Sequence, residues 1–292
     1  MKGVCRLCNG DGDLRKSHFI PKFVGKWVKA TSITGYIREG SQPSKRAQDI
    51  AKEYWLCGSC EQVFSNWERE FANKIFYPFV DQNVSSLNYE NWMSKFCASL
   101  SWRTLTYMRS KNPDDELIQD RKLLLDAAQE HLKKYLLGEV DNLYQYEQHL
   151  FPLESIESAK NVNLPTSINR YFLRTLAMDI VENGKNHFIF TKLPSFILLG
   201  VIKSDCSKKM RSSRIALKSG MISPRDYVLP YGFDEYLLKK ASEIIDLHRK
   251  IPQEHLDGFD QYIKENPEKV LGSKQFNAFL DDYYSFGDDV FK

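Results

Sequence analysis

Two Cys-x-x-Cys pairs, Cys5–Cys8 and Cys57–Cys60, constrain the fold of this chain more than any other feature of its sequence. Four cysteine thiolates are a complete ligand set for a structural Zn²⁺, because tetrahedral coordination then leaves no open position. The long segment between the pairs does not prevent one shared site, since the entropy cost of closing a loop grows only logarithmically with its length. We therefore expect one structural zinc ion bound by these four cysteines, with the intervening His18 left for other chemistry.

The rest of the sequence is typical of an intracellular globular protein. Cys97 and Cys206 are isolated, so metal binding explains the cysteine pattern better than disulfides do. Residues 1–20 contain no apolar run of signal-peptide length, and no apolar stretch approaches the roughly 20 residues that cross a bilayer. We expect a cytoplasmic protein that does not enter the membrane, with room for about two domains.

The positive charge is concentrated near the N-terminus. Residues 1–60 contain eleven Lys and Arg against five Asp and Glu, although the whole chain has a formal net charge of only +3. A basic segment on a slightly acidic remainder is typical of a protein that contacts a polyanion such as nucleic acid. The candidate contacts are Arg15, Lys16, Lys22 and Lys26; the alternative is that these cations form an ordinary solvated surface.

The apolar pattern predicts two domains, residues 1–80 and 81–292. In the first, Asn9-Gly10-Asp11-Gly12 is a strong turn signal, and residues 27–38 are expected to contain extended segments. A helix then begins near Glu61, with an apolar stripe, and Pro78 is expected to end it. Glu61 and Glu68 lie on one neighbouring face of this helix, within about 40° of each other at 100° per residue.

Residues 81–292 are expected to form an α-rich domain with a small antiparallel sheet near 186–222, which makes the fold class α+β, mainly α. The expected helices cover residues 91–108, 112–138, 166–181, 234–249, 254–264 and 273–284. The expected hairpin joins strands at 187–192 and 196–202, and a third short strand lies at 214–217 or 221–222.

Three motifs of the N-terminal region resemble a known family. The motifs are Cys-x-x-Cys, then Ser17-His18-Phe19-Ile20-Pro21, then Leu56-Cys-x-x-Cys60-Glu61 at the start of a helix. Over residues 1–75 they resemble the HNH (His-Me finger) endonuclease superfamily in its treble-clef zinc form. The resemblance implies a metal-dependent endonuclease that hydrolyses phosphodiester bonds, in DNA in preference to RNA, and an antiphage or restriction-like setting.

The resemblance also implies roles for individual residues. His18 matches the general base, and a neutral imidazole suits that role near neutral pH. Glu61 stands where the family has a histidine that helps to hold a catalytic Mg²⁺ or Mn²⁺, and a carboxylate suits such a cation at least as well. Glu68 is a candidate second ligand or orienting group. The four cysteines match the structural zinc ligands.

The chain departs from the family pattern at two places. Ser17 stands where the family often has a metal-binding acid or histidine, and no asparagine lies between His18 and Cys57, so that Asp49 or Gln48 would have to replace it. A second hypothesis is therefore a non-catalytic treble-clef zinc module that binds nucleic acid or a protein partner. Residues 81–292 carry no catalytic motif of their own, and we expect them to supply substrate selection, a partner surface or a homo-oligomer contact.

Overall fold

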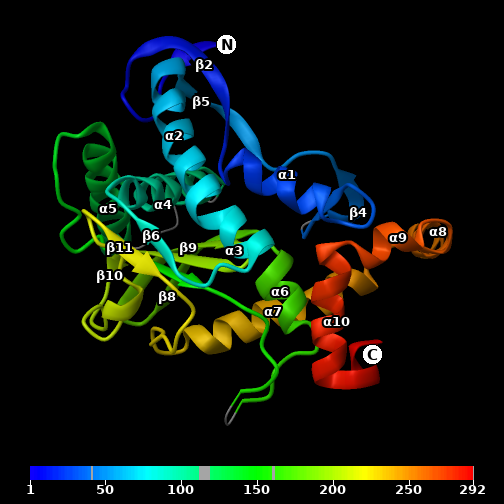
Figure 1. Cartoon of the computed structure of the whole chain (residues 1–292). Coiled ribbons are helices and arrows are strands. Elements are labelled where there is room, and N and C mark those ends of the chain that lie inside the picture. The colour runs from blue at the N-terminus through cyan, green and yellow to red at the C-terminus, as the bar shows by residue number, and fades with distance from the viewer. Residues whose placement is uncertain (41, 112–118, 160–161, 292) are drawn as a thin grey trace. The chain divides into compact units, whose positions relative to one another are not determined.

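The computed structural model describes residues 1–40, 42–111, 119–159 and 162–291 (Figure 1). The chain has the predicted α+β class, with many helices and small antiparallel sheets.

The chain forms two compact units, each built from separate segments. The first unit contains residues 1–21, 51–152 and 176–230, and the second contains residues 22–50, 153–175 and 231–292. These units do not coincide with the expected division at residue 80, because residues 22–50 belong to the second unit and residues 81–152 to the first.

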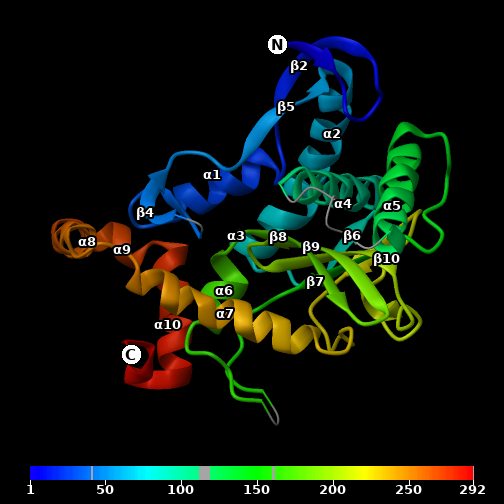
Figure 2. The ribbon, with the colours of Figure 1, turned by 180° about the vertical axis from the view of Figure 1, so that it is seen from behind.

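A three-stranded antiparallel sheet forms the N-terminal part of the first unit. Its strands are β1 (Lys2–Val4), β2 (Asp11–His18) and β5 (Lys52–Cys57), in the order β1-β2-β5. The helix α2 (Gly58–Phe71) follows β5 without a loop and lies beside β2 and β5 in both views (Figures 1 and 2). The sheet therefore delivers the chain directly from the second cysteine pair into the predicted helix.

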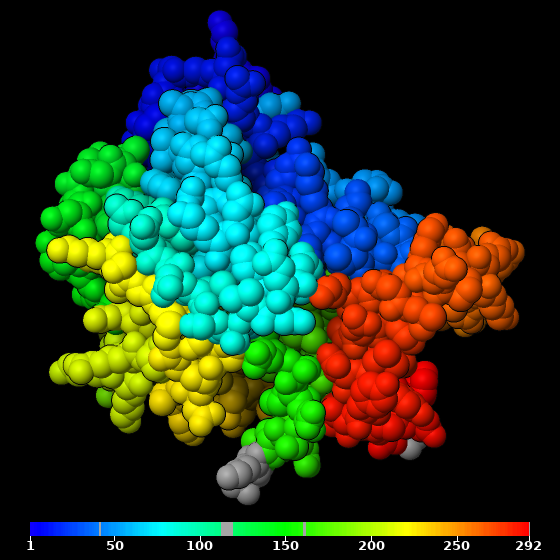
Figure 3. Space-filling view, viewed as in Figure 1, coloured from blue at the N-terminus to red at the C-terminus, as the bar shows by residue number. Residues whose placement is uncertain are grey.

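The helical segment after the second cysteine pair is longer than the sequence predicts. A π-helical turn (Ala72–Phe76) connects α2 to α3 (Tyr77–Gln82), and Pro78 lies in the first turn of α3. The prediction that Pro78 ends the helix is wrong. Proline lacks an amide hydrogen, and its cost is small where a new helical turn begins. The segment ends instead at Asn83, which has a φ of 55°. Its outer surface is visible in the space-filling view (Figure 3).

Two long helices follow. The helix α4 (Trp92–Lys111) confirms the one predicted at 91–108, and α5 (Gln119–Leu137) ends before Gly138, as predicted, at a φ of 79°. The expected start of the second helix at Asn112 lies outside the described residues. Between α3 and α4, β6 (Leu87–Tyr89) pairs with β11 (Gly220–Ile222), one of the two positions expected for a third short strand.

A four-stranded antiparallel sheet completes the first unit, in the order β7-β10-β9-β8. The strands β9 (Asn186–Leu193) and β10 (Phe196–Lys203) confirm the predicted hairpin, and β7 (Gln148–Pro152) pairs with β10. The fourth strand, β8 (Ala177–Asn183), pairs with β9.

The predicted helix at 166–181 is wrong in its second half. Only α6 (Ile168–Arg174) is helical, and the chain then extends into β8. Asn183 and Gly184 resemble a helix stop, but Asn183 is the last residue of β8 and pairs with Asn186, and Gly184, at a φ of 55°, begins the turn to β9. A glycine at positive φ suits a tight hairpin turn as well as a helix end, and pairing with β9 decides between the two.

The described part of the second unit consists of helices, one hairpin and the loops that join them. It contains α1 (Lys22–Ala30), the hairpin β3 (Ile37–Glu39) and β4 (Gln42–Ala47), α6, and the C-terminal helices α7 (Phe233–Arg249), α8 (Gln253–Glu265), α9 (Pro267–Leu271) and α10 (Lys274–Phe286), followed by a 3₁₀ turn (Gly287–Phe291). The helices α7, α8 and α10 confirm the three predicted C-terminal helices.

The expected extended segments over residues 27–38 are wrong for the first four residues, because α1 continues to Ala30. Arg174 stabilises the end of this helix: its guanidinium donates to the Val28 carbonyl (2.9 Å) and to the Thr31 hydroxyl (2.6 Å). A cation suits the negative end of a helix dipole. The cap comes from a residue far away in the sequence, so the local pattern could not indicate it.

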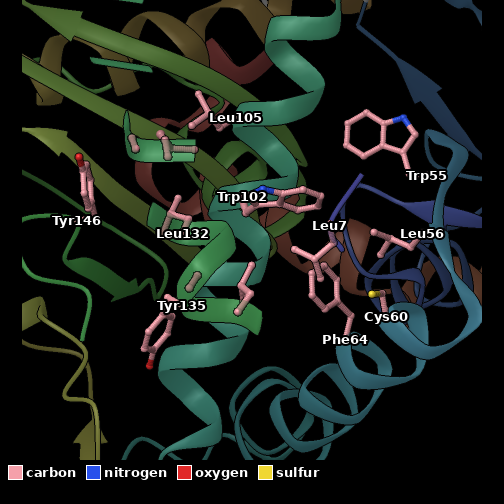
Figure 4. Packing of buried hydrophobic residues seen from close by; sticks show 14 of the residues in the cluster. Leu7, Trp55, Leu56, Cys60, Phe64, Trp102, Leu105, Leu132, Tyr135 and Tyr146 are labelled. Atoms are coloured by element: carbon pink, nitrogen blue, oxygen red, sulfur yellow. The ribbon is translucent and has the colours of Figure 1, made fainter. Parts of the chain in front are cut away.

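The two cysteine pairs and α4 share one hydrophobic core. The ring centroid of Trp102 on α4 lies 6.4 Å from that of Trp55 on β5 and 6.2 Å from that of Phe64 on α2, and all three side chains are buried (Figure 4). Phe71 of α2 stacks on Phe96 of α4 at 4.0 Å. This shared packing explains why the cysteine region and residues 81–152 belong to one unit.

No helix in the described ranges has the length and apolar character needed to cross a bilayer.

Candidate functional site

The four cysteines of the two pairs form a cluster that could hold a zinc ion. The Sγ atoms of Cys5, Cys8, Cys57 and Cys60 all lie within 4.8 Å of one another, and those of Cys8 and Cys57 are 3.8 Å apart. Tetrahedral coordination with Zn–S bonds of about 2.3 Å places the sulfur atoms roughly 3.8 Å from one another. The donor set and its spacing therefore fit the predicted structural zinc.

Backbone hydrogen bonds shape the first cysteine pair. The Cys5 amide donates to the Gly10 carbonyl (3.0 Å), and the Asn9 amide donates to the Cys5 carbonyl (2.9 Å). Asn9 has a φ of 59°, which asparagine tolerates better than most residues. The Arg6 amide also donates to the Trp55 carbonyl (2.9 Å), which ties this turn to β5 beside the second pair.

The cysteine thiols have different electrostatic environments. A hydrogen bond with the Ser59 hydroxyl (3.1 Å), together with the Cys60 amide, lowers the pKa of Cys57 to about 6. Burial, reinforced by hydrogen bonds with the thiols of Cys57 and Cys8, raises the pKa of Cys60. Four adjacent thiols do not all ionise without a cation, and a metal supplies the charge that makes four thiolates stable.

Next to this cluster, Ser17 connects β2 to α2. The buried Ser17 hydroxyl donates a hydrogen bond of 2.6 Å to Oε2 of Glu61, the residue that follows Cys60. Glu61 is half-buried, and its Oε1 accepts no hydrogen bond from the described part of the chain. One carboxylate oxygen of Glu61 is thus held in place, and the other is left for a ligand.

Arg103 connects Glu68 to the backbone at His18. Its Nη1 donates to Oε1 of Glu68 (2.6 Å) and to the backbone carbonyl of His18 (3.0 Å). His18 is the last residue of β2 and is half-buried. The Nη2 atom of Arg103 is buried and has no hydrogen-bond partner among the residues that the structure describes. Arg103 thus joins Glu68 to the backbone of His18, and Ser17, the residue before His18, is joined to Glu61.

Sequence reasoning missed Arg103. The available signal was weak: a cation stands in the predicted helix 91–108, three residues after Leu100 and four before Tyr107, and these spacings place all three on one helix face. Arginine is almost never fully buried unless it is paired, so an inward arginine indicates a buried acid elsewhere in the chain. The sequence does not identify that acid, and the structure shows it to be Glu68.

The expected substitutes for the missing asparagine are engaged locally in the second unit. The backbone carbonyl and Oε1 of Gln48 accept hydrogen bonds from Lys29 Nζ (2.7 and 3.1 Å), and Oδ1 of Asp49 accepts one from the Ile50 amide (2.9 Å).

The four candidate nucleic-acid contacts are all exposed, but they belong to different units. Arg15 and Lys16 lie on β2 in the first unit, where Lys16 Nζ is 5.3 Å from the centroid of the Tyr54 ring. Lys22 and Lys26 lie on α1 in the second unit. The structure thus presents them as two separate exposed pairs.

No family model, curated protein or solved structure matches the chain. The functional argument therefore depends on the residues of the site.

Proposed function

We propose that this protein is a metal-dependent endonuclease of the HNH type, built on a treble-clef zinc module. The observation that carries the proposal is the hydrogen bond between Ser17 and Glu61. In the family that the sequence resembles, the residue before the general base and the residue after the last zinc cysteine help to hold the catalytic metal. Ser17 and Glu61 stand at these two positions, and their side chains are in contact.

The proposed chemistry assigns separate tasks to the residues of the site. His18 takes a proton from the attacking water as a neutral imidazole. Glu61 offers its unoccupied Oε1 to a hard divalent cation, for which carboxylate oxygens are the preferred protein ligands. A bound Mg²⁺ or Mn²⁺ supplies stabilisation of the charge that develops on the scissile phosphate and the leaving oxygen.

Arg103 acts in this scheme as a positioning residue. Its Nη1 donates both to the carbonyl of His18 and to the carboxylate of Glu68, and so holds the two acceptors close together. Glu68 is neutralised by this contact, so its proposed task is to orient Arg103, and through it the end of β2. The zinc cluster fixes the N-terminal end of α2, whereas Glu68 lies near its C-terminal end, and the zinc has no part in the chemistry.

A specific observation favours a second candidate function. The centre has a serine in place of an acid at position 17, and Glu68 is engaged by Arg103 at 2.6 Å. Of the two predicted acids, Glu68 already faces a cation, which leaves Oε1 of Glu61 as the oxygen offered to a catalytic cation. These features favour a non-catalytic zinc module that binds nucleic acid or a protein partner.

The biological setting is part of the same proposal. We place the protein in the cytoplasm, with DNA as the preferred substrate and a role in antiphage defence. The α-rich remainder of the chain, including α4 and α5, would supply substrate selection, a partner surface or a homo-oligomer contact.

A plasmid-nicking assay with Mg²⁺ or Mn²⁺ tests the proposed function. We expect His18→Ala and Glu61→Gln each to lower the cleavage rate about 100-fold or more, because a general base typically contributes that much. Zinc content and melting temperature should stay unchanged. Glu70→Gln is the matched control, since Glu70 lies on the same helix and pairs with Lys74 rather than with the site.

Three outcomes decide between the candidates. Cleavage that survives His18→Ala would remove His18 from the mechanism. No cleavage of DNA or RNA, with one zinc per chain and no second divalent site by calorimetry, would leave the non-catalytic module. A second site that is lost in Glu61→Gln would support the enzyme.

A further inference from the structure

The first unit contains a polar cleft that is separate from the acidic site. Its volume is about 580 Å³, and it is lined by the turn of the first cysteine pair together with the helices α4 and α5. The turn contributes Arg6 and Asn9, α4 contributes Arg109, and α5 contributes Asp126 and Lys133. None of His18, Glu61, Glu68 and Arg103 lines it. The volume is that of a site for a small group.

The acids that line the cleft are already neutralised. Arg109 donates from Nη2 to Oδ1 of Asp126 (2.6 Å) and from Nη1 to Oε1 of Gln129 (2.8 Å). The other acid, Glu130, pairs with Lys134 at 3.7 Å along α5. The negative charge in the cleft is therefore compensated before any ligand enters.

Two cations of the cleft have no directly bonded acid. Neither Arg6 nor Lys133 makes a side-chain hydrogen bond or ion pair with the described residues. The nearby acid Glu53 attracts Arg6 only through space: its hydrogen bonds come from Lys111 (2.8 Å) and the Trp55 indole (3.0 Å), and the Lys111 hydrogen bond is the main cause of its lowered pKa. A net positive charge thus remains at the cleft.

The guanidinium of Arg6 is held in a defined orientation. Its Cζ lies 5.0 Å from the centroid of the Trp55 ring, which is buried in the core of the unit. A cation–π contact of this kind restrains the plane of the group while leaving its N–H groups able to donate. A restrained guanidinium is the side chain best suited to a bidentate hydrogen bond with a phosphate.

We propose that this cleft binds a backbone phosphate of a nucleic-acid strand, with Arg6 and Lys133 as the charged ligands and the side-chain amide of Asn9 as a neutral donor. The proposal rests on the proposed function only in naming a nucleic-acid strand as the source of the phosphate. A zwitterion is a poorer fit, because the acids that would receive its ammonium group are already paired.

The test measures strand binding by fluorescence anisotropy with labelled 20-nucleotide single-stranded DNA, duplex DNA and RNA, at several salt concentrations. We expect Arg6→Gln and Lys133→Gln each to weaken binding about fivefold to tenfold and to reduce the salt slope by about one. Lys122→Gln is the matched control: it removes the same charge from a residue of α5 that does not line the cleft. Zinc content is measured in Arg6→Gln, because Arg6 lies between two zinc ligands.

The outcomes separate this proposal from the nuclease proposal. Equal affinity and salt slope in the wild type, Arg6→Gln and Lys133→Gln would overturn the cleft as a phosphate site, whether or not the protein cleaves DNA. If the wild type cleaves no nucleic acid but Arg6→Gln and Lys133→Gln both bind the strand more weakly, the phosphate site is supported and only the nuclease proposal is overturned. ATP serves as a probe of free phosphate: Arg6-dependent ATP binding without any strand binding would overturn the strand as the source.

Discussion

At the scale of single residues, Arg103 decides more about the candidate site than any acid does. Its side chain is 4% exposed and that of Glu68 is 19% exposed, and they form an ion pair at 2.6 Å. Removing two charges from water is costly, and such a pair stabilises a fold only while both partners are present. The loss of one partner leaves an uncompensated charge in the core.

We predict that Arg103→Met lowers the free energy of unfolding by about 3–5 kcal/mol, because Glu68 then stays buried without its partner. The double variant Arg103→Met with Glu68→Leu should recover much of this loss. Urea denaturation measures both. Glu70→Gln, which breaks the exposed pair with Lys74 on the same helix, should leave the midpoint unchanged. Equal losses in the single and double variants would contradict a paired role.

At the scale of elements, the cysteines lie where strands and helices begin or end. Cys57 is the last residue of β5, Cys60 lies in the first turn of α2, and Cys5 and Cys8 lie between β1 and β2. The strand β1 is only three residues long, so it adds few ladder hydrogen bonds to the sheet β1-β2-β5. A metal that joins β5, α2 and the first turn would contribute the stability that so small a sheet lacks.

We therefore predict that Cys57→Ser or Cys60→Ser abolishes stoichiometric zinc binding and the cooperative unfolding of the cysteine region. Apparent zinc-binding free energies are on the order of 10 kcal/mol, so one missing ligand is expected to matter. Zinc content by mass spectrometry and thermal unfolding by circular dichroism check this. Cys206→Ser is the control, since Cys206 lies outside the cluster. Full zinc content with unchanged melting in either variant would refute the prediction.

At the scale of the whole molecule, the sheet β7-β10-β9-β8 buries a lysine. The Lys192 side chain on β9 is fully buried, and its Nζ donates a hydrogen bond to the Leu193 carbonyl. Burial lowers the pKa of Lys192 well below its ordinary value of 10.5. Between its folded pKa and 10.5, the unfolded chain binds a proton at Lys192 that the folded chain does not, so stability rises with pH in that window.

The corresponding prediction concerns pH dependence. The free energy of unfolding of the wild type should rise by up to about 1.4 kcal/mol per pH unit above the folded pKa of Lys192. Lys192→Met should be more stable at pH 7 and should lack this component of the slope. Urea unfolding between pH 6 and 9 measures it, with Lys185→Met at the exposed β8–β9 turn as the control. Parallel pH profiles for the wild type and Lys192→Met would rule the effect out.

The sequence alone determined the features whose signal is local. Each cysteine pair is a four-residue motif, so the zinc cluster was predictable without any knowledge of the fold. The helix 91–108 and the hairpin at 187–202 were also predictable, because apolar spacing reports which face of an element is buried. The position of Glu61 beside the cysteine cluster was predictable too, because Glu61 directly follows Cys60 in the sequence.

Only the tertiary structure decided the features that depend on partners distant in the sequence. Arg174 caps α1, pairing with β9 turns residues 177–183 into a strand, and Arg103 holds Glu68 and the end of β2. The first unit extends past the expected boundary at residue 80 for the same reason, since Trp55 and Phe64 pack on Trp102. Periodicity reports that a face is buried, but it carries no information about what buries it. That choice depends on the free energy of contacts that form only when the whole chain has folded.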